Sequence, residues 1–324
     1  MRDFAYHRAT SLADAKQALS AGGALALAGG TTLVDLAKLN VLVPEVVVDL
    51  SALPGMADIA LRDGRLHIGA LARMTDVARH PDIRSLAPAI ASALELAASG
   101  QIRNMATIGG NLLQRTRCAY YRDPSTYARC NKRVPGSGCA AKDGVTPNHA
   151  ILGTTDACIA AYPGDLGVAL AALDATVHTD MRVVPFADLF LPPGSESGRE
   201  TILDADEIIT GVSIEPGSAT ARSTFLKIRD RQSYEFAAVS VAVALDLAGP
   251  RPDIRIAVGG VSARPWRLGA VEDALRQGSL DLTRIRAAAG LAGVGARCTP
   301  DNGFKLILLT RAVERALTTA LDLS

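Results

Sequence analysis

The stretch ALAGGTTLV, residues 26–34, joins a short apolar segment to a helical one through two adjacent glycines. The segment ALALA predicts a buried strand, and GGTTLVDLAKL reads as a glycine turn that enters a helix. Two glycines at such a junction let the backbone turn its N–H groups inward, beside helix N–H groups that lack partners. Backbone donors of this kind suit a phosphate or diphosphate. A plain strand-to-helix turn is the alternative, because the stretch has neither the Walker pattern nor GxGxxG.

A second glycine turn, TIGGN at residues 107–111, strengthens the diphosphate interpretation. The surrounding ATIGGNLL resembles a strand that ends at a tight Gly-Gly turn. Two such turns can hold one diphosphate from both sides, and the hydroxyls of Thr31, Thr32 and Thr107 add hydrogen bonds. Neither turn offers a paired cation, so the donors are those that a tightly held dinucleotide cofactor can use.

The flanking sequence predicts an α+β fold in two parts. Residues 1–55 read as a small lobe with a β-α-β unit, since SLADAKQALSAGG predicts a helix and EVVVDL a buried strand. Next come a hairpin at Asp63-Gly64, a helical stretch from about Thr75 to Ser99, and DLGVALAALDATV as a helix that runs into a strand. After the loop LPPGSESGRE we expect strands at 222–230, 238–247 and 253–261 and helices near 269–277, 283–291 and 303–321. The predicted domains are 1–217, with lobes 1–55 and 56–217, and 218–324.

Composition excludes several classes of function. The 34 basic and 33 acidic side chains of the 324 residues nearly cancel and form no long run, which argues against a polyanion-binding surface. Aromatic residues make up only 4%, too few for nucleic-acid stacking platforms. The N-terminus MRDFAYHRAT lacks the apolar core of a secretion signal, and no run of about 18 uncharged apolar residues occurs. We therefore expect a soluble chain without membrane insertion.

Four of the five cysteines fall in or near the most polar stretch of the chain. Cys118, Cys130, Cys139 and Cys158 follow the pattern C-x11-C-x8-C-x18-C, and Cys298 stands apart. Buried structural thiols are the ordinary alternative, but a core role is unexpected among RTR, YYRD, NKR and PGSG. Disulfides need an oxidising compartment, and a zinc site usually shows a close C-x2-C pair, which is absent. A [4Fe–4S] cluster fits best, with zinc second. The neighbouring cations that could offset its charge are Arg115, Arg117, Arg122, Arg129, Lys132 and Arg133.

An ordered set of motifs resembles the FAD-binding medium subunit of the molybdenum hydroxylases, which include xanthine dehydrogenases, carbon monoxide dehydrogenases and aldehyde oxidoreductases. The motifs span nearly the whole chain: LAGGTTLVDLAK, EVVVDLS, LHIGALARMTDV, ATIGGNLLQ, PGDLGVALAALDA and FLKIRDRQSYEFAAVSVAVAL. The resemblance implies a two-lobed FAD-binding domain of the vanillyl-alcohol-oxidase type, followed by a smaller α+β domain.

The segment at about residues 114–160, which holds the clustered cysteines, is an insertion relative to most of this family. It resembles two branches with an extra [4Fe–4S] cluster: the flavin subunit of periplasmic aldehyde oxidoreductase and the β subunit of 4-hydroxybenzoyl-CoA reductase. NLLQRTRC, CNKRVPGSGC and HAILGTTDACIA are more similar to the aldehyde oxidoreductase. Cys118, Cys130, Cys139 and Cys158 are thereby the expected cluster ligands.

The resemblance also implies where FAD binds. It assigns the first glycine turn and the TIGGN turn to the FAD diphosphate and the adjoining ribityl chain. It places Asp165 of YPGDLG in contact with FAD, Leu191 of LFLPPG in a loop beside it and Lys227 of FLKIRD near it. The expected cofactor-binding residues are Ala26, Leu27, Ala28, Gly29, Gly30, Thr31, Thr32, Leu33, Val34, Thr107, Gly110, Asn111, Asp165, Leu191 and Lys227.

The resemblance implies an electron-transfer subunit of a heterotrimer. A molybdenum-cofactor large subunit oxidises an aldehyde to a carboxylic acid, a [2Fe–2S] small subunit relays the electrons, and the FAD of this chain passes them to an acceptor. A 4-hydroxybenzoyl-CoA reductase-like or xanthine dehydrogenase-like complex is the alternative. A self-sufficient flavin oxidase would need an acid/base constellation, which does not stand out, and a non-catalytic iron–sulfur scaffold also stays open. The expected compartment is the periplasm if a signal-bearing partner exports the chain, and otherwise the cytoplasm.

Overall fold

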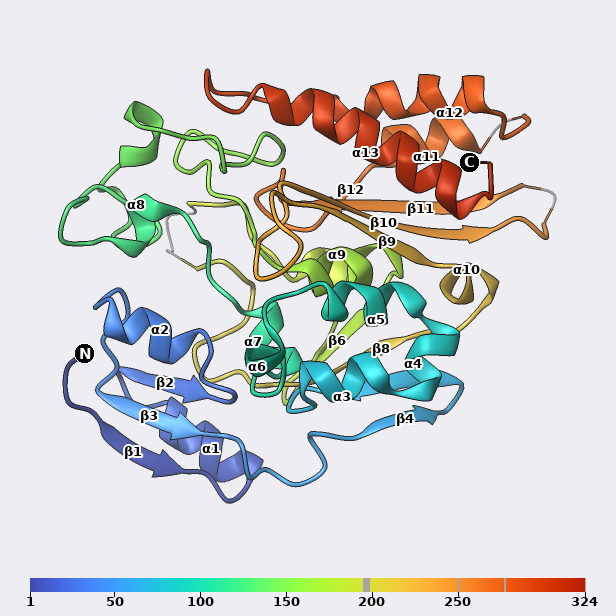
Figure 1. The fold of residues 1–324 in the computed structure, drawn as a ribbon. Helices are drawn as coiled ribbons and strands as arrows, with labels where there is room; N and C mark the ends of the chain where they lie inside the picture. The colour runs from blue at the N-terminus through green and yellow to red at the C-terminus, as the bar shows by residue number, and fades with distance from the viewer. Residues whose placement is uncertain (195–198, 250, 277, 324) are drawn as a thin grey trace.

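The computed structural model describes residues 1–194, 199–249, 251–276 and 278–323, and Figure 1 shows the course of the chain. Residues 195–198 of the loop LPPGSESGRE lie outside the described residues. Three β-sheets of three, five and four strands make up the framework.

The first sheet forms the small lobe at the N-terminal end. Its three strands run in the order β1-β3-β2, and both pairs are parallel, as the predicted β-α-β unit requires. Ser11 caps the first helix, since its hydroxyl accepts a hydrogen bond from the backbone N–H of Asp14 at 3.1 Å. The elements are β1 (Ala5–Arg8), α1 (Leu12–Leu19), β2 (Ala24–Leu27), α2 (Leu33–Lys38) and β3 (Val46–Asp49).

The second sheet has five antiparallel strands in the order β4-β5-β8-β6-β7. The predicted hairpin is confirmed: Arg62 pairs with Arg65, and the two turn residues Asp63 and Gly64 have φ values of 49° and 73°. Positive φ at both positions is what a two-residue turn between twisted strands requires. The strands are β4 (Ile59–Arg62), β5 (Arg65–Gly69), β6 (Thr176–Thr179), β7 (Val183–Pro185) and β8 (Ile209–Ile214).

The stretch expected to be helical, from about Thr75 to Ser99, contains three helices in the structure. Pro81 and Pro88 each stand at the first position of a new helix, where the missing N–H is not needed. Apolar periodicity continues through both prolines and so concealed the breaks. The helices are α3 (Met74–Arg79), α4 (Pro81–Leu86) and α5 (Pro88–Glu95), and α6 (Gly100–Arg103) follows them.

The third sheet belongs to the C-terminal part and is antiparallel, in the order β12-β11-β10-β9. Strand β10 separates two hydrophobic cores: Val241 and Val243 pack toward the C-terminal helices, while Ala242 and Ala244 join the core that contains α9. The small alanines let α9 lie close against the sheet. The elements are α9 (Asp165–Ala172), α10 (Ser218–Ala221), β9 (Thr224–Ile228), β10 (Val239–Asp246), β11 (Asp253–Gly259), β12 (Trp266–Arg267), α11 (Gly269–Leu275), α12 (Leu282–Ala289) and α13 (Phe304–Ala320).

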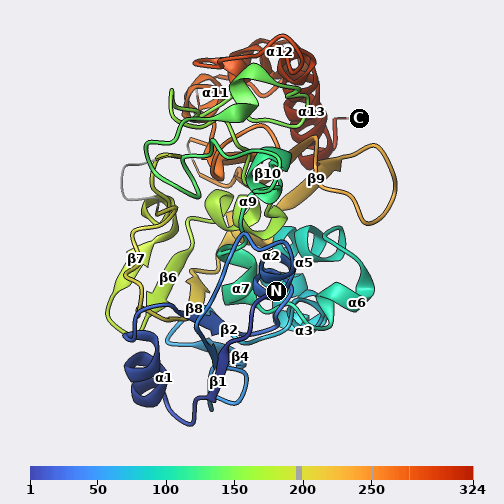
Figure 2. The ribbon, with the colours of Figure 1, turned by 90° about the vertical axis from the view of Figure 1, so that its left-hand side faces the viewer.

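The cysteine-rich segment, residues 114–160, contains little regular structure: α8 (Ala119–Arg122) and a 3₁₀ turn at Ala140–Asp143. It is the green chain in Figures 1 and 2, where it lies near the C-terminal helices. Thr146 and Thr299 join the two parts through hydroxyl oxygens 2.6 Å apart. At its other end, Tyr121 and Cys130 form a small apolar cluster with Leu36 of helix α2. The insertion therefore bridges the small lobe and the C-terminal part.

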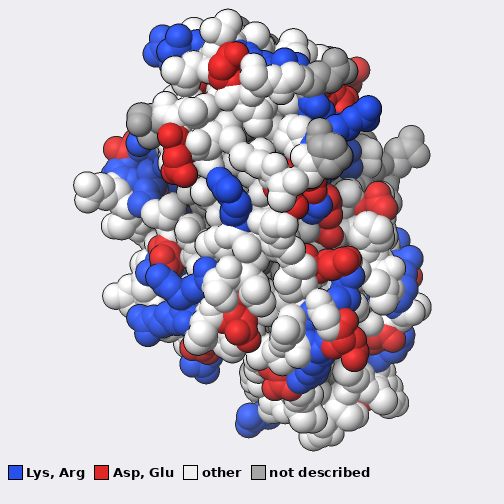
Figure 3. All heavy atoms as spheres, turned by 90° about the vertical axis from the view of Figure 1, so that its right-hand side faces the viewer, with Lys and Arg blue, Asp and Glu red and all other residues white. Residues whose placement is uncertain are grey.

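The surface agrees with the balanced composition. On the face in Figure 3, acidic and basic side chains are interspersed. No described helix is both long and apolar enough to cross a membrane.

Candidate functional site

The first glycine turn lies directly against the chain segment before the second. A Cβ atom on Gly29 would lie 2.0 Å from the carbonyl oxygen of Met105 and 3.0 Å from the Cα of Ala106. Gly30 has φ +74°, in the region that favours glycine. Contact between the two turns thus depends on the absence of a side chain at Gly29, and the bend itself depends on Gly30.

The second turn is a helix start, which corrects the strand predicted for ATIGGNLL. Thr107 has an extended backbone (φ −101°, ψ 161°) and precedes α7 (Ile108–Leu112). Its hydroxyl accepts a long hydrogen bond of 3.4 Å from the backbone N–H of Gly110. Threonine at this position stabilises the first turn of a helix. Thr107 therefore acts as the N-cap of α7, although the apolar residues on either side resemble those of a strand.

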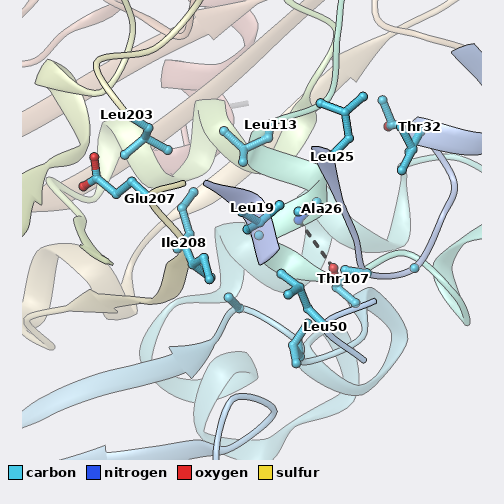
Figure 4. Close-up of a pocket in the computed structure, with 18 of the residues that line it drawn as sticks. Leu19, Leu25, Ala26, Thr32, Leu50, Thr107, Leu113, Leu203, Glu207 and Ile208 are labelled. Atoms are coloured by element: carbon cyan, nitrogen blue, oxygen red, sulfur yellow. Dashed lines mark hydrogen bonds between the residues drawn. The ribbon is translucent and has the colours of Figure 1, made fainter. Parts of the chain in front are cut away.

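Both glycine turns line one cavity of about 320 Å³ between the small lobe and the five-stranded sheet. The backbone N–H groups of Gly29 through Leu33 donate to no other described residue, so this wall presents unpaired donors. The rest of the lining is mostly apolar, as Leu19, Leu50 and Leu203 show in Figure 4, although Arg115, Asp204 and Glu207 also belong to it. Unpaired donors beside an apolar wall suit a ligand with one anionic and one aromatic part.

Most of the predicted residues of the two turns line this cavity, although Leu27, Val34 and Asn111 do not. Those that do are Ala26, Ala28, Gly29, Gly30, Thr31, Thr32, Leu33, Thr107 and Gly110. Sequence reasoning missed the wall formed by the segment from Leu203 to Ile209 and the contributions of Leu50 and Arg115. These positions carry no local motif, because only the fold brings them to the glycine turns.

Asn111 and Asp165 line a second cavity of about 490 Å³. It shares Thr31, Thr32 and Gly110 with the first cavity, so the two adjoin at the glycine turns. The glycine turns therefore border both cavities.

Asp165 and Lys227 form a buried ion pair. The Nζ of Lys227 lies 2.7 Å from Oδ2 of Asp165, and the two side chains are 1% and 5% exposed. Lys227 also donates to the carbonyl oxygen of Leu96 at 3.1 Å. Burial raises the pKa of Asp165, and the adjacent Lys227 ammonium works against that rise. The structure therefore places Lys227 behind Asp165, where it holds the carboxylate at the start of α9.

Leu191 lies elsewhere, in a third cavity of about 260 Å³. Leu113, Arg115 and Thr201 line both this cavity and the first one. Leu191 thus reaches the region of the glycine turns through a neighbouring space, and it does not line the same cavity as the turns.

The four clustered cysteines converge, although their sequence spacing is wide. All four line one small cavity of about 10 Å³, together with Lys132 and Arg129. Cys130 and Cys139 face each other in an isolated antiparallel bridge. Burial, with smaller contributions from Cys158 and Cys130, raises the pKa of the Cys118 thiol to about 11.

Burial also raises the pKa of Cys158. Cys298 is exposed and lies apart. Within the described residues, no group of three or more His, Cys, Asp or Glu side chains is arranged to hold a metal ion.

The six cations around these cysteines all have partners of their own within the described residues. Five of them pair with carboxylates, and the sixth, Arg133, donates to the backbone carbonyls of Tyr120 and Tyr121. The pairs are Arg115 and Lys132 with Glu200, Arg117 and Arg122 with Asp35, and Arg129 with Asp143. These contacts fasten the insertion to the small lobe and to the loop after Leu191.

Two buried residues that sequence reasoning missed stand beside the cysteines. His149 is 5% exposed, and its Nε2 lies 3.3 Å from Sγ of Cys118. Lys305, at 1% exposure, donates to the carbonyl oxygens of His149 and Gly260 at 3.1 and 2.8 Å. Burial lowers the pKa of Lys305 to about 8, and burial together with Lys305 lowers that of His149 to about 4. A lone lysine in the apolar stretch FKLIL was the available signal.

Comparison with known proteins agrees with this arrangement. Residues 2–216 match the family model described as the FAD binding domain in molybdopterin dehydrogenase, and residues 224–304 match the CO dehydrogenase flavoprotein C-terminal domain. The chain is 42% identical to the aldehyde oxidoreductase FAD-binding subunit PaoB of Escherichia coli K12, over 99% of both chains. It is 28% identical to the nicotinate dehydrogenase FAD-subunit of Eubacterium barkeri, over 89% of this chain and 84% of the relative.

The fold is also that of a solved structure. Carbon monoxide dehydrogenase from Hydrogenophaga pseudoflava superposes with a TM-score of 0.77 at 22% identity, covering 99% of this chain and 98% of the other. The predicted α+β class, with an FAD-binding domain before a smaller C-terminal domain, is confirmed. The chain belongs to the family of oxidoreductase FAD-binding subunits of the molybdenum hydroxylases.

Proposed function

We propose that this chain is the FAD- and [4Fe–4S]-binding electron-transfer subunit of a heterotrimeric molybdenum-dependent aldehyde oxidoreductase. The observation that carries the proposal is the convergence of both glycine turns on one cavity, close to a second convergence of four cysteines. Helix α2 connects them, because it begins at the first turn and packs through Leu36 against Tyr121 and Cys130. The similarity to an aldehyde oxidoreductase subunit over almost the whole chain supports the substrate class.

The residues of the two adjoining cavities fit FAD. In the proposal, the unpaired N–H groups of the first turn and the hydroxyls of Thr31 and Thr32 hold the diphosphate. Gly110 is exposed, and an added Cβ would meet only Thr107 Oγ1, at 3.2 Å, so its backbone is open to a ligand. Asp165, held by Lys227, offers carboxylate oxygens that suit sugar hydroxyls. Bound flavin supplies the redox chemistry, and the protein supplies its position and electrostatic surroundings.

We propose that the cysteines bind a cluster rather than a single metal ion. A zinc ion needs its thiolates about 2.3 Å away, which draws their sulfurs close together around one point. The described cysteines converge on one small space, but they are not among any group arranged for a single ion. In a [4Fe–4S] cluster four cysteine thiolates bind one cluster, and all four of these cysteines line the same space. We propose Cys118, Cys130, Cys139 and Cys158 as its ligands.

The proposed partners are a molybdenum-cofactor large subunit and a [2Fe–2S] small subunit. We also propose that the FAD-binding domain ends at residue 217, that the C-terminal domain follows it, and that the cluster insertion covers about residues 114–160. The compartment is the periplasm if a partner carries an export signal, and otherwise the cytoplasm.

The decisive experiment compares the isolated chain with the complex. The purified chain is expected to bind FAD and to leave aldehydes unoxidised, and addition of both partners should restore turnover with an artificial electron acceptor. Aldehyde oxidation by the chain alone, at the rate of the complex, would show that it is a self-sufficient oxidase. A complex that reduces 4-hydroxybenzoyl-CoA or oxidises xanthine, and leaves aldehydes untouched, would instead support the alternative complexes.

The cluster is tested separately through iron content. Cys130→Ser is expected to lower the iron bound per chain and to speed hydrogen exchange in residues 114–160, because one ligand is lost. Cys298→Ser is the matched control, since Cys298 is exposed and outside the insertion. Unchanged iron in Cys130→Ser would remove that residue from the ligand set.

A further inference from the structure

His149 is a buried histidine that neither glycine turn uses and that the cofactor assignments leave without a role. It is 5% exposed, and its ring faces the insertion: Nε2 lies 3.3 Å from Sγ of Cys118, within hydrogen-bond reach of sulfur. Its ring centroid is 6.0 Å from that of Tyr120. The side chain therefore has one polar neighbour on the Nε2 side, and that neighbour is a proposed cluster ligand.

The backbone of His149 is held from the C-terminal part of the molecule. Its carbonyl oxygen accepts from Nζ of Lys305 at 3.1 Å and from Nδ2 of Asn302 at 3.4 Å. Lys305 and Asn302 are 1% and 0% exposed. Its own N–H donates to the carbonyl of Thr146 at 3.1 Å. Three hydrogen bonds with buried residues thus fix the backbone of His149, from which its ring reaches the cysteine.

The surroundings of the ring determine which nitrogen carries the proton. Nδ1 is buried and has no hydrogen-bond partner among the described residues. A buried N–H without an acceptor is rarer in proteins than a buried acceptor without a donor. The tautomer with its proton on Nε2 therefore fits this site, and it directs the N–H toward the sulfur of Cys118.

We propose that His149 is a positioning and tuning residue for the cluster, donating an Nε2–H hydrogen bond to the thiolate of Cys118. This inference rests on the proposed cluster. A hydrogen bond to a ligating sulfur stabilises negative charge, and the reduced cluster carries more of it, so the bond raises the reduction potential. Among the four cysteines, Cys118 is the one whose sulfur has a side-chain partner in the described residues; Cys158 accepts from the backbone N–H of Ala160, which substitution leaves in place.

The test uses the heterotrimer with two substitutions of His149. His149→Phe keeps an aromatic ring and removes the donor, and His149→Gln keeps an N–H at a similar reach. His7→Phe is the matched control, because His7 lies on β1 and pairs with Asp14. Each protein is analysed for iron and FAD content and for the midpoint potential of the cluster, followed by electron paramagnetic resonance during a redox titration.

We expect His149→Phe to retain iron and FAD and to show a lower midpoint potential, with His149→Gln closer to wild type and His7→Phe unchanged. An unshifted potential in His149→Phe, with iron retained, would overturn the proposal. Loss of iron from both His149 variants would also overturn it, since His149 would then be a ligand or a packing residue. Absence of iron from the wild-type heterotrimer is a separate outcome that removes the proposed cluster itself.

Discussion

The glycine turns and the cysteine insertion both contact helix α2, and they are held in place by different forces. At the turns, backbone lies against backbone, as at Gly29 and the carbonyl of Met105. The insertion has few regular elements, and ion pairs such as Arg122 with Asp35 fasten it to its neighbours. Close packing leaves no room for an added atom, whereas partly exposed ion pairs contribute little each. Substitutions at the glycine turns should therefore lower the free energy of unfolding more than substitutions of the ion pairs of the insertion.

The largest effect is expected at Gly29. Gly29→Ala places a Cβ 2.0 Å from a backbone oxygen, so the two turns must separate, at a cost of about 3 kcal/mol or more. Gly110→Ala meets only Thr107 Oγ1, at 3.2 Å, and should retain its fold while losing FAD affinity. Chemical unfolding and flavin content, measured on both variants, separate the two effects.

The control for this pair is Gly100→Ala, where an added Cβ meets nothing within 4 Å. It should match the wild type in both measurements. A Gly29→Ala protein with normal stability and full flavin content would contradict the prediction that close backbone packing at Gly29 holds the two turns together.

A second effect concerns Lys305, the buried lysine whose ammonium group donates to the backbone of the insertion at His149. The pKa of Lys305 is lowered to about 8, below the value of about 10.4 expected in the unfolded chain. Between these values the unfolded state binds more protons, so the free energy of unfolding rises with pH in this window, by roughly 3 kcal/mol in all. Lys305→Met should lack this rise, which chemical unfolding at pH 7.5 to 10.5 would detect.

Lys142→Met is the control for the alkaline series, since Lys142 lies in the insertion that Lys305 contacts and is exposed. Its pH dependence should follow that of the wild type. Parallel curves for wild type and Lys305→Met would mean that Lys305 keeps an ordinary pKa despite its burial.

The smallest effect is expected where the insertion meets the small lobe. Asp35→Asn removes the charge shared by Arg117 and Arg122, at a cost of about 1 kcal/mol because the carboxylate is 41% exposed. Hydrogen exchange should quicken in residues 114–160 and change little at the glycine turns. In Asp58→Asn, which loses an exposed pair with Arg62, neither region should respond. Faster exchange at the turns alone would contradict the proposed attachment.

Several features could be predicted from sequence because short segments determine them. The hairpin at Asp63-Gly64 follows from two residues that accept positive φ, and the parallel small lobe follows from alternating apolar strand and helix patterns. Apolar periodicity predicted the helical stretch after Thr75 but did not indicate its breaks at Pro81 and Pro88. Around Thr107, strand-like flanks concealed a helix cap.

The sequence by itself determined the glycine turns, the order of strands and helices and the segment that carries the cysteines, since each depends on residues near one another in the chain. Only the tertiary structure decided that Asp165 pairs with Lys227, 62 residues away, and that His149 faces Cys118. It alone brought Leu203 and Ile208 to the cavity of the glycine turns. The physical reason is that a buried charge needs an opposite charge or a hydrogen-bond partner, and a cavity needs lining residues, from whichever segment the fold places beside it. Such segments are distant in the chain, so the local sequence pattern does not identify them.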